Sequence, residues 1–405
     1  MMSETVQTEK EGLSRSKSLW NREFVFLFAV VFLAYANISV FFQFYEYLRT
    51  LPIDPRWYGL LISLFSAVSL AVRPVVSPFF HAGNARRYLY AGAGMLVVTL
   101  VLYSAAGELW SLFLVRALHG LAFVLLGTAL MSVIVDYIPK ERSAQLFGFL
   151  AILTLIPNTL IPPLLPFLTR RLGGLPGVLL LFAGITLVIF PLILGVPRAR
   201  TGTESSLSQG RLKGREVLDD VLDPNILVTL VAMLLLYSGH ALVFFFLDGY
   251  GRSVGIRDTG FFLTLSTLGE IGVRLAAGPL FDRVSKARLA GWSLIGITLG
   301  YGALGFVSDR TLFFSLGVIL GLGWGTAMPV MNGLMFDLSL PKFRAFNINL
   351  GLQMFQGGFF LGPIIGGPVV IHWGFPVLFQ ICAAFGFLCA GLLFHLERKM
   401  HPAVA

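Results

Sequence analysis

Charged residues are scarce in this sequence, since Asp, Glu, Lys and Arg together account for 13% of its 405 residues. Cysteine is scarcer still: Cys382 and Cys389 lie in one apolar run, whose composition predicts neither a disulfide framework nor a metal site. No Gly-rich nucleotide-binding loop, zinc-binding His-Glu pattern or nucleophile elbow occurs in a suitable sequence context. We therefore expect no cofactor and no enzymatic activity.

Apolar residues, in contrast, are abundant. They make up 56% of the chain, and the mean hydropathy is +0.81, more than the core of a soluble domain of this length needs. A run of about 20 apolar residues is long enough to cross the hydrocarbon core of a bilayer. We therefore predict an all-α membrane protein with twelve transmembrane helices. They are expected to begin near Phe24, Trp57, Tyr88, Trp110, Ala144, Pro176, Ile226, Phe261, Leu289, Leu312, Ala345 and Phe375.

An internal repeat divides the chain into two halves. The stretch VRPVVSPFFHAGNARR at 72–87 returns as VRLAAGPLFDRVSKAR at 273–288, with five identities at an offset of 201. A repeat of this length predicts two related bundles of six helices, joined by the long polar stretch between them. The expected organisation is a cytoplasmic tail at 1–23, bundles at 24–196 and 223–396, a cytoplasmic linker at 197–222 and a C-terminal tail at 397–405.

Lys and Arg are distributed unevenly between the two sides of the predicted helices. With the N-terminus inside, the inner segments carry 20 of these residues and the outer loops carry 7. Basic loops tend to remain on the cytoplasmic side of a membrane, so both termini are expected in the cytoplasm. This distribution also accounts for the net charge of +9 without a nucleic-acid partner, because no basic face with interleaved aromatic residues is present.

Three motifs resemble signatures of the major facilitator superfamily of transporters. The segment GPLFDRVSKAR (278–288) resembles the superfamily's loop signature between spans eight and nine. RALHGLAF (116–123) resembles its signature on span four, and PKERSA (139–144) resembles its usual entry to span five. Two features depart from the family pattern. His81 replaces an acidic residue in the first-half loop, and an antiporter-like GPIIGG (362–367) lies in span eleven instead of span five.

The resemblance implies a fold and a mode of action. It implies two six-helix bundles that alternate access to a central site, as secondary transporters do. The RALHG stretch is similar to that of bacterial proton-coupled exporters, which implies proton-linked export of a small organic molecule by a monomer embedded in the lipid bilayer of the cytoplasmic membrane. Proton-linked uptake of an organic anion or metabolite, and facilitated diffusion, remain alternatives. We do not expect a non-transporting receptor, because such a protein would normally carry a soluble sensing domain. The implied gate and loop residues are Arg73, Asp282, Arg283, Arg288 and Arg142.

Charged side chains inside the predicted spans are the strongest candidates for substrate binding or coupling, because charge at membrane depth is costly and tends to face a protein interior or an aqueous cavity. Glu270 and Arg274 are four residues apart on one helix face. They form either a structural ion pair or a proton-coupling carboxylate with a modulating cation. Arg73 is the repeat equivalent of Arg274, and we expect a structural role near the gate, with contact to the substrate as the alternative. Spans three, six, nine and twelve have no charge in their interiors, so the other eight are expected to line the transport path.

Other polar residues inside the spans each admit two interpretations. Arg116 either extends to the outer surface or contacts the substrate. His119 and His240 either titrate during transport or pack as hydrogen-bonded side chains. Glu46 and Asp248, at the outer ends of spans one and seven, are weaker candidates. The uncharged candidates, which either contact substrate or bond between helices, are Asn37, Gln43, Asn158, Asn332, Gln353 and Gln356.

Overall fold

The computed structural model describes residues 22–76, 79, 82–137, 143–196, 214–281, 283–340 and 343–400, and the regular secondary structure in these ranges is helical. We call α2 to α9 the N-terminal helices and α11 to α15 the C-terminal helices. The N-terminal helices are α2 (Arg22–Ser39), η1 (Val40–Gln43), α3 (Phe44–Leu48), η2 (Pro55–Trp57), α4 (Tyr58–Val76), α5 (Ala82–Leu102), α6 (Leu109–Tyr137), α7 (Ser143–Arg171), α8 (Leu175–Thr186) and α9 (Ile189–Gly195). They are followed by α10 (Gly214–Val221), α11 (Pro224–Ser253), α12 (Gly260–Phe281), α13 (Lys286–Leu304), α14 (Arg310–Leu338) and α15 (Arg344–Met400).

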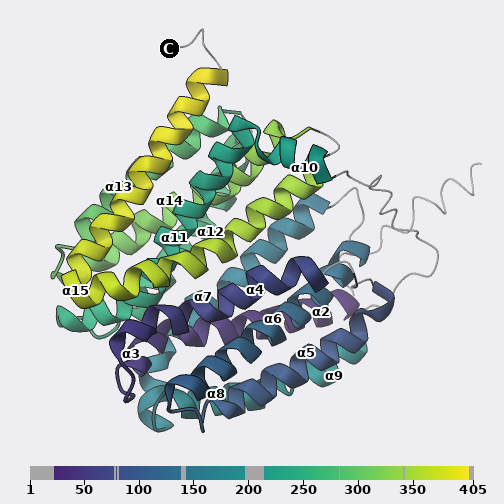
Figure 1. Ribbon diagram of the computed structural model, residues 1–405, viewed down its shortest axis with the longest axis vertical. Helices are drawn as coiled ribbons and strands as arrows, with labels where there is room; N and C mark the ends of the chain where they lie inside the picture. The colour runs from purple at the N-terminus through teal and green to yellow at the C-terminus, as the bar shows by residue number, and fades with distance from the viewer. Residues whose placement is uncertain are drawn as a thin grey trace, which may run out of the picture.

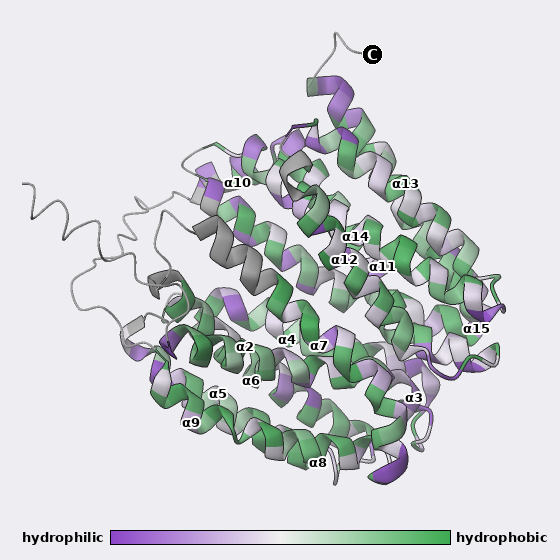
Figure 2. Cartoon of the chain, turned by 180° about the vertical axis from the view of Figure 1, so that it is seen from behind, coloured by the Kyte–Doolittle hydropathy of each residue, from purple (hydrophilic) through white to green (hydrophobic). Residues whose placement is uncertain are grey.

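Most of these helices are suited to a membrane. Ten helical segments among the described residues are long and apolar enough to cross one. Hydrophobic residues cover most of the helix surfaces, and hydrophilic residues gather toward the helix ends and connections (Figure 2). Four prolines lie inside α7. Membrane helices tolerate proline because neighbouring helices can satisfy the backbone groups that it leaves unpaired. The prediction of an all-helical, multi-pass membrane protein is confirmed.

The repeat is visible in the backbone as two equivalent turns. GGLPG (173–177) spans the start of α8, and WGFPV (373–377) interrupts α15. Gly174 has φ 105° and Gly374 has φ 79°, a conformation that favours glycine, and each is followed two residues later by a proline. The non-helical backbone at Gly374 divides the 57 residues of α15 into two helical parts.

The helices pack mainly within their own set. In the N-terminal helices, α5 packs on α6 and α8, and α4 packs on α6. In the C-terminal helices, α15 packs on α11 and α13, and α12 packs on α14. The main contacts between the two sets are those of α4 and η2 with α15, of α7 with α12, and of α3 and η1 with α11. They lie close together near α3 and diverge toward α10 (Figure 1).

Candidate functional site

The contacts between the two sets of helices obey the sequence repeat. Gly59 and Gly260 differ by the repeat offset of 201, as do Pro162 and Pro363. A Cβ added to Gly59 would lie 2.2 Å from the Pro363 carbonyl oxygen, and one added to Gly260 would lie 2.5 Å from the Pro162 carbonyl oxygen. Each half therefore supplies a glycine that packs against the equivalent proline of the other half. We call the region around these four residues the joined end.

The GPIIGG motif contributes to this packing. Gly367 lies beside Gly59, because an added Cβ would be 2.9 Å from the Gly59 Cα atom. A Cβ at Gly362 would be 2.9 Å from the carbonyl oxygen of Ser238 on α11. Small residues allow membrane helices to approach closely. In this structure the motif therefore brings α15 against both α4 and α11.

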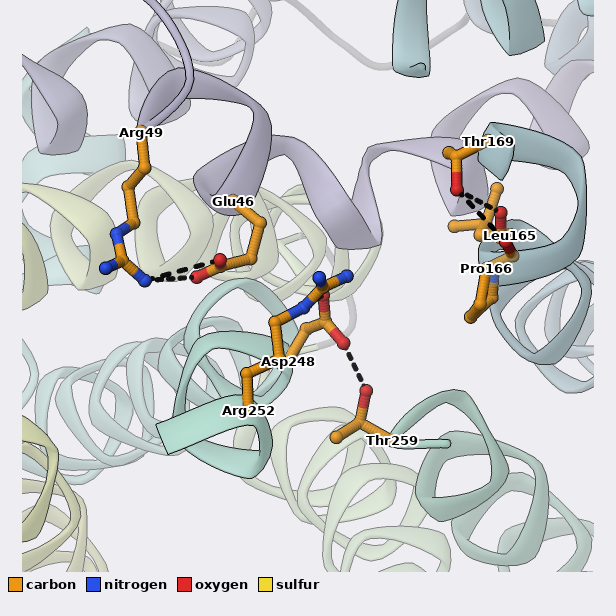
Figure 3. A network of polar contacts seen from close by, with 8 residues as sticks. All are labelled: Glu46, Arg49, Leu165, Pro166, Thr169, Asp248, Arg252 and Thr259. Atoms are coloured by element: carbon orange, nitrogen blue, oxygen red, sulfur yellow. Dashed lines mark hydrogen bonds and ion pairs between the residues drawn. The ribbon is translucent and has the colours of Figure 1, made fainter. Parts of the chain in front are cut away.

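Two ion pairs lie beside the joined end, each within its own set of helices (Figure 3). Glu46 Oε1 is 3.1 Å from Arg49 Nη1, and Asp248 Oδ2 is 3.0 Å from Arg252 Nε. Thr259 also donates a hydrogen bond to Asp248, which is 1% exposed. Glu46 and Asp248 are therefore already paired in this conformation.

Glu270 and Arg274 form the ion pair that their spacing predicted. Arg274 Nη2 is 3.1 Å from Glu270 Oε2, and the Glu270 side chain is 4% exposed. Arg274 Nε also donates to the Gly325 carbonyl oxygen at 3.3 Å. A Cβ at Gly325 would be 2.6 Å from the Glu270 Cα atom, so glycine lets α14 approach α12 at this point. The pair is thus fixed between two helices of the C-terminal set.

His240 lies in aromatic surroundings on α11. Its ring is 4.3 Å from Trp324 in a T-shaped arrangement and 5.9 Å from Phe359. The Trp324 indole donates to the Tyr301 hydroxyl at 2.9 Å. His240 Nδ1 and Gln353 Oε1 are buried without a hydrogen-bond partner among the described residues. Sequence reasoning missed Trp324, because an aromatic residue in an apolar span looks like a lipid contact.

Arg116 does not reach the surface. The residue is 2% exposed, and its guanidinium donates to the carbonyl oxygens of Leu61 at 3.2 Å and Ile62 at 3.1 Å. The rings of Phe41 and Phe44 lie 4.5 and 4.6 Å from its Cζ atom, within range of cation–π attraction. These contacts join α6 to α4 and also to η1 and α3, which contain Phe41 and Phe44.

His119 completes this buried cluster one helical turn further along α6. Its Nδ1 atom is 3.4 Å from the Tyr103 hydroxyl, and its ring is 4.9 Å from Phe41. Its Nε2 atom is buried and has no hydrogen-bond partner among the described residues. His119 therefore packs beside Arg116 inside the N-terminal helices.

The asparagine candidates bond to neighbouring helices. Asn37 Nδ2 donates to Thr186 Oγ1 at 3.1 Å, which ties α2 to α8. Ser39 Oγ donates to Asn158 Oδ1 at 2.5 Å, which ties α2 to α7. Asn332 Nδ2 donates to the carbonyl oxygen of Met328 on its own helix at 3.1 Å. Gln356 is 7% exposed. For Asn37 and Asn158 the geometry favours interhelical bonding within the N-terminal set.

The loop motif contacts the last turns of α15. Arg288 Nη2 is 3.1 Å from Glu397 Oε1, and Ser285 also donates to Glu397. Arg283 is exposed. Asp282, Arg142 and His81 lie outside the described residues. The sequence did not single out Glu397, because a carboxylate at the end of a span is usually solvated.

Arg73 on α4 differs from the other intramembrane arginines. It is half-buried, and its Nε atom is buried with no hydrogen-bond partner among the described residues. The described residues also hold no cluster of three or more His, Cys, Asp or Glu side chains that could bind a metal ion.

Several known proteins share this fold. The chain superposes on the nucleoside transporter NupG with a TM-score of 0.73 at 14% identity, covering 93% of this chain and 99% of that one. It also superposes on a bacterial homologue of the human lysosomal transporter Spinster, in an inward-facing and occupied conformation, with a TM-score of 0.73 at 14% identity, covering 92% of this chain and 96% of that one.

Sequence comparison gives relatives of similar length. Multidrug resistance protein MdtG of Citrobacter koseri is 26% identical over 390 residues, which are 90% of this chain and 92% of that protein. MdtG of Escherichia coli O9:H4 is 25% identical over 391 residues, which are 90% and 91% of the two proteins. The Major Facilitator Superfamily profile matches residues 25–257 and 230–405. The chain is therefore a multi-pass membrane transporter and not an enzyme, and it belongs to the Major Facilitator Superfamily.

Proposed function

We propose that this protein exports a small organic molecule across the cytoplasmic membrane by alternating access, driven by protons. The observation that carries this proposal is the pair of repeat-related contacts at the joined end. Two equivalent halves that touch through equivalent residues can rock about a site between them, as secondary transporters with repeats do. The full-length MdtG relatives, named as multidrug resistance proteins, favour export over uptake.

The proposed topology has twelve spans, with both termini and the linker at 197–222 in the cytoplasm. This linker joins two six-helix bundles, at 24–196 and 223–396. The joined end contains the connection between spans one and two, which the Lys and Arg distribution assigns to the outer side. In this topology the joined end closes the outer side, and the structure is the inward-facing state.

Glu270 is proposed as the coupling residue. A carboxylate at membrane depth is costly to keep charged unless it is paired, and Arg274 pairs with it here. Rocking of the two halves would change the access of water to this pair, and with it the cost of keeping the carboxylate charged. The carboxylate would then exchange its cation for a proton, which links protonation to the transport cycle.

Counterflow in proteoliposomes tests the proposal. Purified protein is reconstituted with an unlabelled panel of drugs and metabolites inside, and uptake of each labelled compound is measured with and without a pH gradient. We expect exchange of at least one compound, and accumulation that requires the gradient. Exchange without any effect of the gradient would indicate facilitated diffusion. Accumulation in the direction of proton flow would indicate symport, and absence of exchange for the whole panel would contradict export of a small organic molecule.

A further inference from the structure

Arg116, Arg274 and Arg73 lie in helices that could span a membrane, with Arg73 in the last turn of α4, and their surroundings differ. Arg116 donates to two carbonyl oxygens and is covered by aromatic rings. Arg274 is paired with Glu270 and bonds to a carbonyl oxygen. Arg73 has no ion pair with any described carboxylate, and its Nε atom is buried and unpartnered. A cation in such a place is costly unless something neutralises it during the transport cycle.

The sequence repeat shows what Arg73 lacks. At the offset of 201, Arg73 corresponds to Arg274, and Ser69 corresponds to Glu270. The C-terminal helices therefore carry an acid and an arginine four residues apart, whereas the N-terminal helices carry a serine and an arginine at the same spacing. Ser69 is 0% exposed, and its Oγ atom has no hydrogen-bond partner among the described residues. The N-terminal half thus retains the cation but not the internal counter-charge.

A third donor group lies on the helix that Arg73 faces. Arg73 Nη2 is 3.5 Å from the position that a Cβ at Gly127 would occupy, so the guanidinium reaches α6. The next residue, Thr128, has a buried Oγ1 atom without a hydrogen-bond partner among the described residues. A guanidinium and two hydroxyl groups are donors suited to a carboxylate or a phosphonate.

We infer that Ser69, Arg73 and Thr128 form a binding site for the anionic group of the transported molecule, which makes the substrate an organic anion. This inference rests on the proposed transport function and specifies its substrate class. The bound anion supplies the counter-charge that Glu270 supplies in the other half. The absence of a side chain at Gly127 leaves room on α6 beside the guanidinium.

Equilibrium binding to the purified full-length protein in detergent tests this site with three planar probes of nearly equal shape. The probes are benzoate, benzamide and benzamidine, which are negative, neutral and positive. We expect wild-type protein to bind benzoate more tightly than the other two. Arg73→Gln should weaken benzoate binding by about 10- to 100-fold, the usual effect of losing a hydrogen bond to a charged group. Arg170→Gln, which removes an exposed arginine at the end of α7, should not change it.

Ser69→Glu provides the sharpest variant, because it recreates the acid–arginine spacing of the C-terminal half. The new carboxylate should pair with Arg73 and abolish benzoate binding in a protein that remains monodisperse and helical by circular dichroism. Ser69→Gln, which has a similar volume and no charge, should retain at least part of the binding. Loss of binding in Ser69→Gln equal to that in Ser69→Glu would indicate a steric effect and overturn the inference.

Two further outcomes separate this inference from the transport proposal. Equal wild-type affinity for benzoate and benzamide, or no detectable benzoate binding, would overturn the anion site even if counterflow identifies a neutral or cationic substrate. Charge-selective binding that depends on Arg73, together with no exchange of any compound of the panel in proteoliposomes, would instead retain the site and contradict the transport proposal.

Discussion

Gly59→Ala should weaken the joined end and shift the protein toward a conformation in which that end is separated. The added Cβ would lie 2.2 Å from the Pro363 carbonyl oxygen, about 1 Å closer than carbon and oxygen atoms normally approach. The obstructing atom belongs to the backbone of α15, so the overlap can be relieved only by moving one helix away from the other. Overpacking of this kind costs about 1–3 kcal/mol. Because the cost falls only on the joined conformation, the population ratio should change by a factor of roughly 5 to 150.

Distances between spin labels at Thr50 and Ser253 report this change, because both residues are exposed and they follow α3 and end α11, respectively. The labels are placed in a background without Cys382 and Cys389. The distance distribution should gain a longer component in the Gly59→Ala protein. Gly296→Ala is the matched control, since a Cβ there meets no atom within 4 Å. An unchanged distribution in Gly59→Ala, or an equal change in the control, would refute the steric argument.

Three other predictions concern coupling, topology and stability. Glu270→Gln should abolish gradient-driven accumulation while retaining counterflow, because exchange needs the conformational cycle but no net proton movement; if adding Arg274→Gln restores both folding yield and accumulation, the pair is structural instead. Single cysteines at Ser205 and Ser253 should react with an impermeant reagent from the cytoplasm and from outside, respectively, and labelling of the first in intact cells would contradict the topology. Arg116→Gln should lower the free energy of unfolding by about 2 kcal/mol or more, because carbonyl and aromatic contacts to a buried guanidinium are lost; an unchanged thermal unfolding temperature in detergent would argue against a structural role.

Local sequence patterns were sufficient to predict the type of fold. Apolar runs of membrane-spanning length require helices, because every backbone polar group must be satisfied inside a bilayer. Helical residues are present in each predicted run, with α8 and α9 together in the sixth and the two parts of α15 in the eleventh and twelfth. Gly174 and Gly374 lie at similar positions in the two halves, and both have a positive φ, which favours glycine. The Glu270–Arg274 pair could be predicted because both residues lie on one helix, at a spacing that brings side chains together.

The tertiary structure decided which polar residues are already satisfied. Nothing in the sequence around Arg116 indicates that carbonyl oxygens of α4 accept its hydrogen bonds, because those partners lie more than 50 residues away. Nor does the repeat reveal that Gly59 meets Pro363, since sequence equivalence does not specify which half supplies the partner. Arg73 and Arg274 look alike as repeat equivalents, yet only Arg274 has a described acid beside it. The sequence by itself determined where helices form and which residues are costly in a membrane, because these depend on local composition; the folded chain determined which of them remain free to bind, because that depends on contacts between distant helices.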